Sequence, residues 1–583
     1  MNSGVISSST WSFGDAGRVN IESGCLRIDG QGTLAFIGGL VGPAASGKAG
    51  TVTVKVADLL EVLNGGQISS DTFAEGDAGG VEIESGSLRI DGQGTYSGIS
   101  SGTGSGSSGK AGTVTLKVAD LLEVLNGGDI SSSTLSEGNA GGVEIESGSL
   151  RIDGQGLWAM ISSMTAPNSS GNAGTVVIYV SDLFEIINGG GISCATMGFG
   201  NAGEVDIESR RLSLDGQDCG ALIASSTTSS GNAGSVSINV TDTLEVLNGS
   251  LISSCTHGDG NAGRVAIHAE ELRIDGLGAR ADIDSASVGP AQGYAGDVSI
   301  ETEKLTIQNG GKITIETHQI VSEENLSQAQ MAHLFIESPV VILDQGAKIT
   351  AESCGNAPAA AIGVTSEEIL VSGNSSITTS SSEADGGSIT IQGRIIDLRN
   401  SLITSSVEGA TGNGGDITLM GAGSSSALIL EGGFIQANAP AGATGGDIFI
   451  DVGAIIPEGG VLEVGGQERR QFEAGTGKNI IQAAAPGGEQ GIIEITSPEL
   501  DISGALSNID AAVMEPIRIA ADSCLTTGTA EGSSLVFAGA GGVPGGSNQH
   551  SALFLEGKRL DDILNFKADL DREKTGQADV SEK

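Results

Sequence analysis

One isoleucine returns at a nearly constant interval, and this period constrains the fold more than any other feature of the chain. From Ile6 to Ile223 the residue number rises by 31 at every step, and as far as Ile313 it then rises by 29 to 31. Most of these isoleucines open a phrase such as Ile130-Ser131-Ser132-Ser133-Thr134. A fixed period of this length indicates one supersecondary unit that is repeated along the chain. The regular series is Ile6, Ile37, Ile68, Ile99, Ile130, Ile161, Ile192, Ile223, Ile252, Ile283 and Ile313.

A second landmark, Gly-x-Ala-Gly followed by alternating apolar residues, recurs in the same units. Its step in residue number alternates between a longer one, as from Gly14 to Gly47, and a shorter one, as from Gly47 to Gly76. The closest sequence identity therefore lies two units apart, where 76–94 is nearly repeated as 138–156. This spacing predicts two types of unit that alternate along the chain.

Each unit reads as three short strands without a helix. In one unit they are 113–118, 121–125 and 130–134, and each alternates apolar with polar residues between Gly, Asn or Asp. Such a unit buries its apolar face only by stacking on the next one. The sequence therefore predicts an all-β fold, a parallel β-helix in which each strand pairs with its equivalents in neighbouring coils.

The alternation of side chains along a strand places Ile130, Ser132 and Thr134 on one face. We expect this face to point inward and to carry an aliphatic column beside a column of hydroxyl groups. Hydroxyls in register can bond to one another along the column, which would satisfy them in the interior.

Three columns of outward residues alternate from one coil to the next. Two alternate between acidic residues and lysine, and the third alternates between Asp and Asn. Stacked strands lie about 4.8 Å apart, so opposite charges are predicted to face each other on successive coils. In the third column, Asp or Asn precedes a turn glycine, and both residues tolerate left-handed backbone. The columns are Glu22, Lys55, Glu84, Lys117 and Glu146; Asp15, Lys48, Asp77 and Lys110; and Asp29, Asn64, Asp91, Asn126, Asp153, Asn188, Asp215 and Asn248.

The repeat is regular over residues 1–317 and less regular over 318–513, with a short helical insertion predicted near 323–335. The isoleucine series resumes at Ile349, Ile377, Ile403, Ile435, Ile481 and Ile509, which gives about seventeen coils. Residues 514–546 leave the repeat and are predicted to form the C-terminal cap that an open stack requires. A polar segment, 547–583, is predicted to be helical or mobile.

Charge and cysteine spacing exclude several classes of partner and site. The chain has 28 Lys and Arg against 72 Asp and Glu, a net charge of −44, which disfavours nucleic acid and anionic membranes as partners. No stretch approaches the ~20 apolar residues that span a bilayer. The cysteines have no metal-site spacing, and structural thiols are favoured over disulfides. They are Cys25, Cys194, Cys219, Cys255, Cys354 and Cys524.

The best local candidate for chemistry is Asp282 with Asp284, which are two residues apart and therefore on one face, with Arg280 nearby and Arg273 one strand back. This pair could hold a cation or act in acid–base catalysis. The alternative, solvated decoration of one coil, is favoured, so no catalytic, cofactor-binding or metal-binding residue and no cofactor is assigned. The histidines form no ligand or nucleophile spacing; they are His257, His268, His318, His333 and His550.

The phrases Gly-Asn-Ala-Gly-x-Val-x-Ile, Leu-x-Val-x-Asn-Gly and Ile-Ser-Ser-x-Thr resemble the C-terminal repeats of filamentous-haemagglutinin-like exoproteins. Near the end of the chain, Cys524 followed by 533–537 and by 541–544 looks like the terminal segment of that family. The resemblance covers nearly the whole chain to about residue 546. It implies a right-handed β-helix and export by two-partner secretion from a Gram-negative bacterium, such as a cyanobacterium.

The same resemblance implies a secreted or surface-exposed adhesin that binds a glycan, a host surface or an abiotic surface. The family's secretion domain, which engages the outer-membrane transporter, has no counterpart here, and residues 1–6 begin inside a repeat without a signal peptide. We therefore expect a fragment or a truncated reading frame of a longer exoprotein. Two alternatives remain open: a carbohydrate-active β-helix enzyme, namely a polysaccharide lyase or hydrolase, and a structural spacer rod.

Overall fold

A computed structural model describes residues 4–43, 45–289, 293–321, 331–423 and 425–496, and within these ranges the chain forms strands and no helix. All described residues belong to a single compact unit. The predicted cap (514–546), the predicted tail (547–583) and Ile509 lie outside the described residues.

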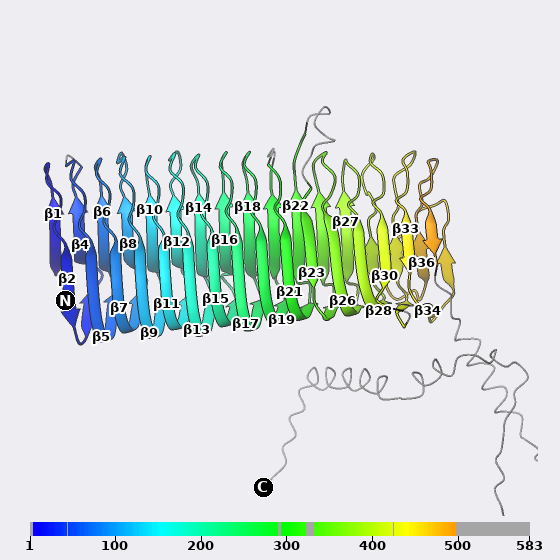
Figure 1. Ribbon diagram of the computed structural model, residues 1–583, viewed down its shortest axis with the longest axis horizontal. Helices are drawn as coiled ribbons and strands as arrows, with labels where there is room; N and C mark the ends of the chain where they lie inside the picture. The colour runs from blue at the N-terminus through cyan, green and yellow to red at the C-terminus, as the bar shows by residue number, and fades with distance from the viewer. Residues whose placement is uncertain (1–3, 44, 290–292, 322–330, 424, 497–583) are drawn as a thin grey trace, which may run out of the picture. The chain divides into compact units, whose positions relative to one another are not determined.

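The described strands pair in parallel with their equivalents one coil away and form two sheets, so the predicted parallel β-helix is confirmed. Figure 1 shows the strands as successive rungs of one stack. The first sheet, here called the isoleucine sheet, contains β1 (Val5–Thr10), β4 (Ala35–Val41), β6 (Gly66–Thr72), β8 (Ser97–Thr103), β10 (Gly128–Thr134), β12 (Ala159–Thr165), β14 (Gly190–Thr196), β16 (Ala221–Thr227), β18 (Ser250–Thr256), β20 (Asp282–Ser287), β22 (Lys312–Thr317), β25 (Lys348–Ser353), β27 (Ser376–Ser381), β29 (Leu402–Thr404), β32 (Phe434–Gln436), β35 (Leu462–Val464) and β36 (Asn479–Gln482).

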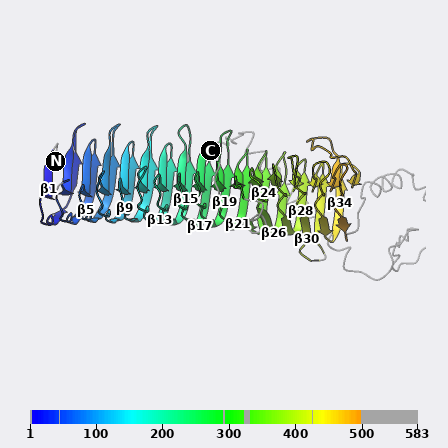
Figure 2. The same ribbon diagram turned by 90° about the horizontal axis from the view of Figure 1, so that it is seen from above.

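The second sheet, here called the long-strand sheet, lies opposite the first in each coil, as the view from above shows (Figure 2). It contains β2 (Val19–Ser23), β3 (Leu26–Asp29), β5 (Val52–Leu63), β7 (Val81–Asp91), β9 (Val114–Leu125), β11 (Val143–Asp153), β13 (Val176–Ile187), β15 (Val205–Asp215), β17 (Val236–Leu247), β19 (Val265–Asp275), β21 (Val298–Gln308), β23 (His333–Glu337), β24 (Val340–Asp344), β26 (Ala361–Val371), β28 (Ile389–Arg399), β30 (Ile417–Gly421), β31 (Ala427–Glu431), β33 (Ile448–Asp451), β34 (Ala454–Glu458) and β37 (Ile493–Ile495).

The isoleucines of the predicted series are register partners in the isoleucine sheet. Sixteen of the seventeen predicted isoleucines pair in order, each with the next, from Ile6 with Ile37 to Ile435 with Ile481. The seventeenth, Ile509, lies outside the described residues, so the stack described here has slightly fewer coils than predicted. Insertions after Thr317 and Gln436 lengthen individual coils without breaking this register.

The predicted inner face is confirmed, because Ile130, Ser132 and Thr134 are all fully buried. The threonine hydroxyls bond in pairs along the column, as between Thr103 and Thr134 at 2.7 Å. The prediction for the serine column was wrong. Ser132 Oγ donates to the carbonyl of Gly112 at 2.9 Å and accepts from the Gly141 N–H at 2.8 Å. The serines thus tie the isoleucine sheet to the glycine landmark of two coils.

The prediction of three strands per coil was wrong for the coils of β5 to β21, β26 and β28, where the first two strands merge into one long strand, and it is confirmed in coils such as that of β2, β3 and β4. β9 spans Val114–Leu125, and its pairing with β11 shifts register between Ser147 and Ser149. From β5 to β19 a longer strand, such as β5 or β9, alternates with a shorter one, such as β7 or β11. Every second coil therefore carries one extra residue at the bend, and this residue is one structural origin of the predicted two-unit period.

The turns between the two sheets alternate as well. Asn126 adopts φ 45° and is followed by Gly127 at φ 87°, a tight two-residue turn. In the other coil type, Asp91 Oδ1 accepts the Gln93 N–H at 3.0 Å, and Gln93 itself adopts φ 51°. Asn supplies left-handed backbone and Asp supplies a hydrogen-bond acceptor, so the two residues of the predicted column perform different tasks.

The predicted charge columns form ion pairs between coils. Lys55 Nζ lies 2.7 Å from Glu84, and Lys48 Nζ lies 2.9 Å from Asp77. Beyond Lys110 the second column changes to asparagine, and each Oδ1 accepts the backbone N–H of the residue one coil further on. The members of this asparagine run are Asn139, Asn172, Asn201, Asn232 and Asn261.

A further alternating column was not recognised in the sequence. Arg27, Glu61, Arg89, Glu123, Arg151 and Glu185 pair in this order on the long-strand sheet. Arg89 lies between Glu123, at 3.4 Å, and Asp91, at 2.8 Å. The column therefore adds ion pairs both within a strand and between coils.

The predicted helix near 323–335 is contradicted at 333–335, where β23 begins, because these residues continue the register of β21. The rest of that insertion, 322–330, lies outside the described residues. The other domain boundaries stay predictions.

Candidate functional site

The outer surface of the long-strand sheet is hollowed along its bend. The groove has a volume of about 1110 Å³ and runs across the coils from β2 to β17. One wall is the first charge column, continued by Tyr179, Glu208 and Asn239, and the floor contains the small residues of the bend, such as Gly86 and Gly148. The groove exists because the register shift turns the strand and because the residues at the turn are small.

The groove is ionic, and two of its carboxylates, those of Glu84 and Glu146, are paired with lysines. Lys55 holds Glu84 at 2.7 Å, and Lys117 holds Glu146 at 3.5 Å. The hydrogen bond from Lys55 keeps the pKa of the Glu84 carboxyl below its usual range. Glu84 therefore stays ionised near neutral pH and is suited to contact a ligand or to act as a base, but not to donate a proton.

The carboxyl groups with raised pKa lie on the other sheet. Burial raises the pKa of Asp71 and of Asp284 to about 6, and burial also raises that of Asp129. All three lie on the outer face of the isoleucine sheet, on β6, β20 and β10. In the described coils, the three carboxyl groups with raised pKa and the carboxylates that line the groove thus lie on different sheets.

Asp282 and Asp284 point to the same face of β20, as predicted, but the expectation of solvated decoration was wrong. Both are buried, at 4% and 5% exposure. Arg280 binds both carboxylates, with Nη2 3.4 Å from Asp284, and Ser253 Oγ donates to Asp284. Arg273 lies on the long-strand sheet, paired with Asp275 at 2.7 Å. The pair is therefore a satisfied buried cluster, closed by Arg280.

Replacement of Asp284 by Asn is expected to flatten the pH dependence of stability between pH 4 and 6. The folded-state pKa, about 6, exceeds the unfolded value of about 3.9, so the folded state binds more protons and loses stability as pH rises through this window. The loss amounts to about 2–3 kcal/mol. Urea titrations of both proteins at pH 4, 6 and 8 measure it. If the free energy of unfolding changed with pH in the same way in both proteins, the raised pKa of Asp284 would be contradicted.

A column of residues directly after the threonine of the repeat phrase forms an apolar edge. Large side chains occupy it on every second coil, namely Trp11, Phe73, Leu135 and Met197, and they are between 39% and 66% exposed. Smaller residues occupy the coils between them: Gly42, Gly104, Ala166 and Thr228. A Cβ on Gly42 would lie 2.2 Å from the Trp11 ring, and one on Gly104 would lie 2.1 Å from the Phe73 ring. The small residues therefore make room for the large ones.

Two neighbouring side chains extend this apolar edge, which we define by Trp11, Phe13, Phe73, Leu135, Met197 and Phe199. Phe13 is 88% exposed and Phe199 is 59% exposed. Large side chains on alternate coils lie two rungs, about 9–10 Å, apart. Contiguous exposed apolar side chains are typical of interaction surfaces.

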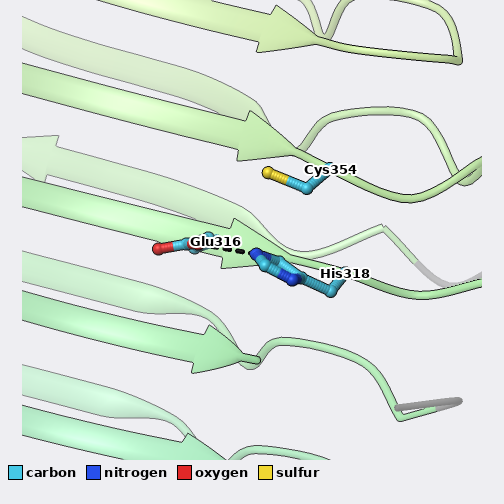
Figure 3. Close-up of side chains that lie close together, drawn as sticks. All are labelled: Glu316, His318 and Cys354. Carbon is cyan, nitrogen blue, oxygen red and sulfur yellow. Dashed lines mark hydrogen bonds and ion pairs between the residues drawn. The ribbon is translucent and has the colours of Figure 1, made fainter. Parts of the chain in front are cut away.

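The same column changes character after Thr228 and continues as His257, Val288, His318 and Cys354. On its last two coils, Glu316, His318 and Cys354 come together with one ligand atom each, all within 4.8 Å of one another (Figure 3). His318 Nε2 lies 2.7 Å from Glu316 Oε1. Burial and the carboxylates of Glu316 and Glu352 raise the pKa of the Cys354 thiol. The spacing of the residues in the sequence does not indicate this cluster, because Cys354 is far from His318 in the sequence and meets it only through coil stacking.

The cysteines within the described residues are free thiols, as favoured from the sequence. Cys194 is structural: it replaces a serine of the inner column, is fully buried, and its Sγ donates to the Glu204 carbonyl at 3.2 Å. Burial raises its pKa to about 12, so it stays protonated. Cys25, Cys219 and Cys354 are exposed, so they do not share the structural role of the buried Cys194.

Comparison with family models, curated proteins and solved structures returns no match for this chain. The resemblance to filamentous-haemagglutinin-like exoproteins therefore stays a prediction. Within the described residues, no helix has the length and apolar character needed to cross a membrane.

Proposed function

We propose that this chain is a non-enzymatic, secreted or surface-exposed adhesin that binds through the apolar edge. The observation that carries the proposal is the exposure of Trp11, Phe73, Leu135 and Met197 at one register position on alternate coils. Core packing does not require these side chains, because they point outward beside buried threonines. A repeated row of large exposed side chains gives a ligand many equivalent contacts, and each adds to the strength of attachment.

The sequence resemblance and the net charge of −44 support the same proposal. The charge keeps an extended protein with exposed apolar residues from self-association. Export through the outer-membrane transporter of a two-partner system, from a Gram-negative bacterium, is part of the proposal and applies to the full-length exoprotein. The ligand would be a glycan, a host surface or an abiotic surface that presents apolar contact area.

Binding to glycan arrays, host-surface proteins and an apolar abiotic surface tests the adhesin. Replacing Trp11, Phe73, Leu135 and Met197 together by Ser is expected to lower binding at least about tenfold, because aromatic and large apolar anchors dominate interface energies. The matched control replaces Leu59 and Leu121, which are also exposed but lie on the long-strand sheet, by Ser. Binding by the fourfold variant equal to that of the control would overturn the proposal.

A carbohydrate-active enzyme is the second candidate, and the groove is the observation that favours it. It extends across eight paired strands, a shape that fits a linear polymer, and Tyr179 offers an exposed aromatic face in its wall. Its carboxylates recur about 9–10 Å apart, because lysines separate Glu84 from Glu22 and Glu146. The pairing of Glu84 and Glu146 with lysines favours ligand contact over catalysis. Turnover on a polysaccharide panel that is abolished by Glu84→Gln would make the enzyme the better account.

A further inference from the structure

The C-terminal ends of β22 and β25, two adjacent strands within the isoleucine sheet, bring three different metal-binding groups together. Glu316 and His318 are two residues apart, so their side chains leave the chain on the same side. Thr317 pairs with Ser353, and the Cys354 N–H donates to the Thr317 carbonyl at 2.8 Å. Cys354 is thereby fixed one rung from His318. The backbone pairing of two coils, not a flexible loop, sets the geometry of this cluster.

The chemistry of the three groups is that of a site for a borderline metal ion. A thiolate, an imidazole and a carboxylate are the ligand types that Zn²⁺ uses, whereas Ca²⁺ and Mg²⁺ select oxygen ligands alone. The side chains of His318 and Glu316 are 27% and 32% exposed, and Cys354 is exposed. An ion can therefore enter from solvent, and a water molecule can occupy the coordination position that the protein leaves open.

The charged side chains next to the cluster, Lys312 and Glu352, do not disfavour the binding of a cation. The nearby ammonium group of Lys312 lies 3.1 Å from Glu352 and is neutralised there. Glu352 pairs in register with Glu316, so one further carboxylate adds negative potential beside the three ligands. The cluster is acidic overall even with Lys312 included.

We propose that Glu316, His318 and Cys354 bind a divalent transition-metal ion of the Zn²⁺ type, with solvent completing the coordination. Binding displaces the thiol proton of Cys354, which passes to solvent. The ring proton that His318 shares with Glu316 moves by exchange with solvent from Nε2 to Nδ1, so that the Nε2 lone pair can bind the ion. Nδ1 accepts a long hydrogen bond from the Gly289 N–H, at 3.3 Å, and that contact is given up.

Titration of the reduced full chain with Co²⁺ tests this site, because a cobalt–thiolate bond produces a charge-transfer absorption in the near ultraviolet. We expect this absorption to saturate at one equivalent and to disappear on addition of Zn²⁺. Cys354→Ser is expected to abolish it, and His318→Ala to weaken Co²⁺ binding at least about tenfold. Cys219→Ser, which removes another exposed thiol, is the matched control and is expected to leave the absorption unchanged.

Two results would overturn the proposal: no charge-transfer absorption at excess Co²⁺, or an absorption that survives Cys354→Ser. Thermal unfolding of each variant without metal shows whether the coil is intact. With Zn²⁺ the wild-type midpoint is expected to rise, since an ion that binds only the folded state stabilises it, and that rise is expected to be absent in Cys354→Ser. The readouts do not depend on adhesion, so this site and the proposed function fail separately.

Discussion

Replacement of Ile130 by Asp is expected to destabilise the protein by about 4 kcal/mol or more. Ile130 is fully buried on β10 and pairs with Ile99 on one side and with Ile161 on the other. The substitution removes an aliphatic side chain from the column and leaves a carboxyl group where the surroundings are aliphatic. Each coil of a stacked repeat is stabilised by its interfaces with the two neighbouring coils, so the loss of stability extends to adjacent coils. The midpoint of urea unfolding, followed by circular dichroism, measures it.

Ser133→Asp is the matched control for this change. Ser133 lies three residues further along the same strand but on the outer face, where Asp71 already occupies the equivalent position two coils away. We expect its urea midpoint to stay near that of the wild type. A similar loss in both variants would mean that any charge on β10 is disruptive, and an unchanged midpoint for Ile130→Asp would contradict the inward assignment.

Replacement of Gly141 by Val is expected to cost about 3 kcal/mol or more, because backbone occupies the space that the side chain needs. A Cβ on Gly141 would lie 2.2 Å from the carbonyl oxygen of Gly112 and 2.9 Å from Ser132 Oγ. A rotamer change cannot relieve a contact with the Cβ itself. The coil would have to shift, and the two hydrogen bonds of Ser132 to the glycine landmark would be lost with it. The urea midpoint measures this loss as well.

Gly24→Ala is the control for this prediction, since no atom lies within 4 Å of a Cβ at that position. We expect it to leave the urea midpoint unchanged or slightly raised, because alanine reduces the freedom of the unfolded chain. Equal effects of Gly24→Ala and Gly141→Val would show that the landmark glycines are required for a reason other than close coil contact.

The period and the alternation of side chains were sufficient to predict the isoleucine register, since both follow from stacking equal coils. The number of strands per coil could not be predicted in the same way. Between Val118 and Leu122 the sequence looks like a break, because outward residues interrupt the alternation, yet the backbone continues through a bulge. Periodicity records which face a residue occupies but not whether the chain bends or stops.

Site prediction was limited by contacts that form only between coils. Asp282 and Asp284 were recognised because they are neighbours in sequence, but their burial depends on Arg280 closing over them and on Ser253 one coil back. The metal-binding cluster joins distant residues across a longer coil, which no local spacing indicates. The apolar edge did have a signal. The residue after each phrase-final threonine alternates between large and small with the two-unit period, as from Phe73 to Leu135.

The alternation of longer and shorter strands fixes the step by which this protein can change its length. Removing 81–113, a single coil, would place Lys55 beside Lys117, Glu61 beside Glu123 and the Phe73 ring beside Leu135. Removing 81–142, two coils, would instead place Lys55 beside Glu146 and Glu61 beside Arg151, which preserves the alternation of charge in both of these columns. Growth or shortening by pairs of coils is compatible with the surface columns, and growth by single coils is not.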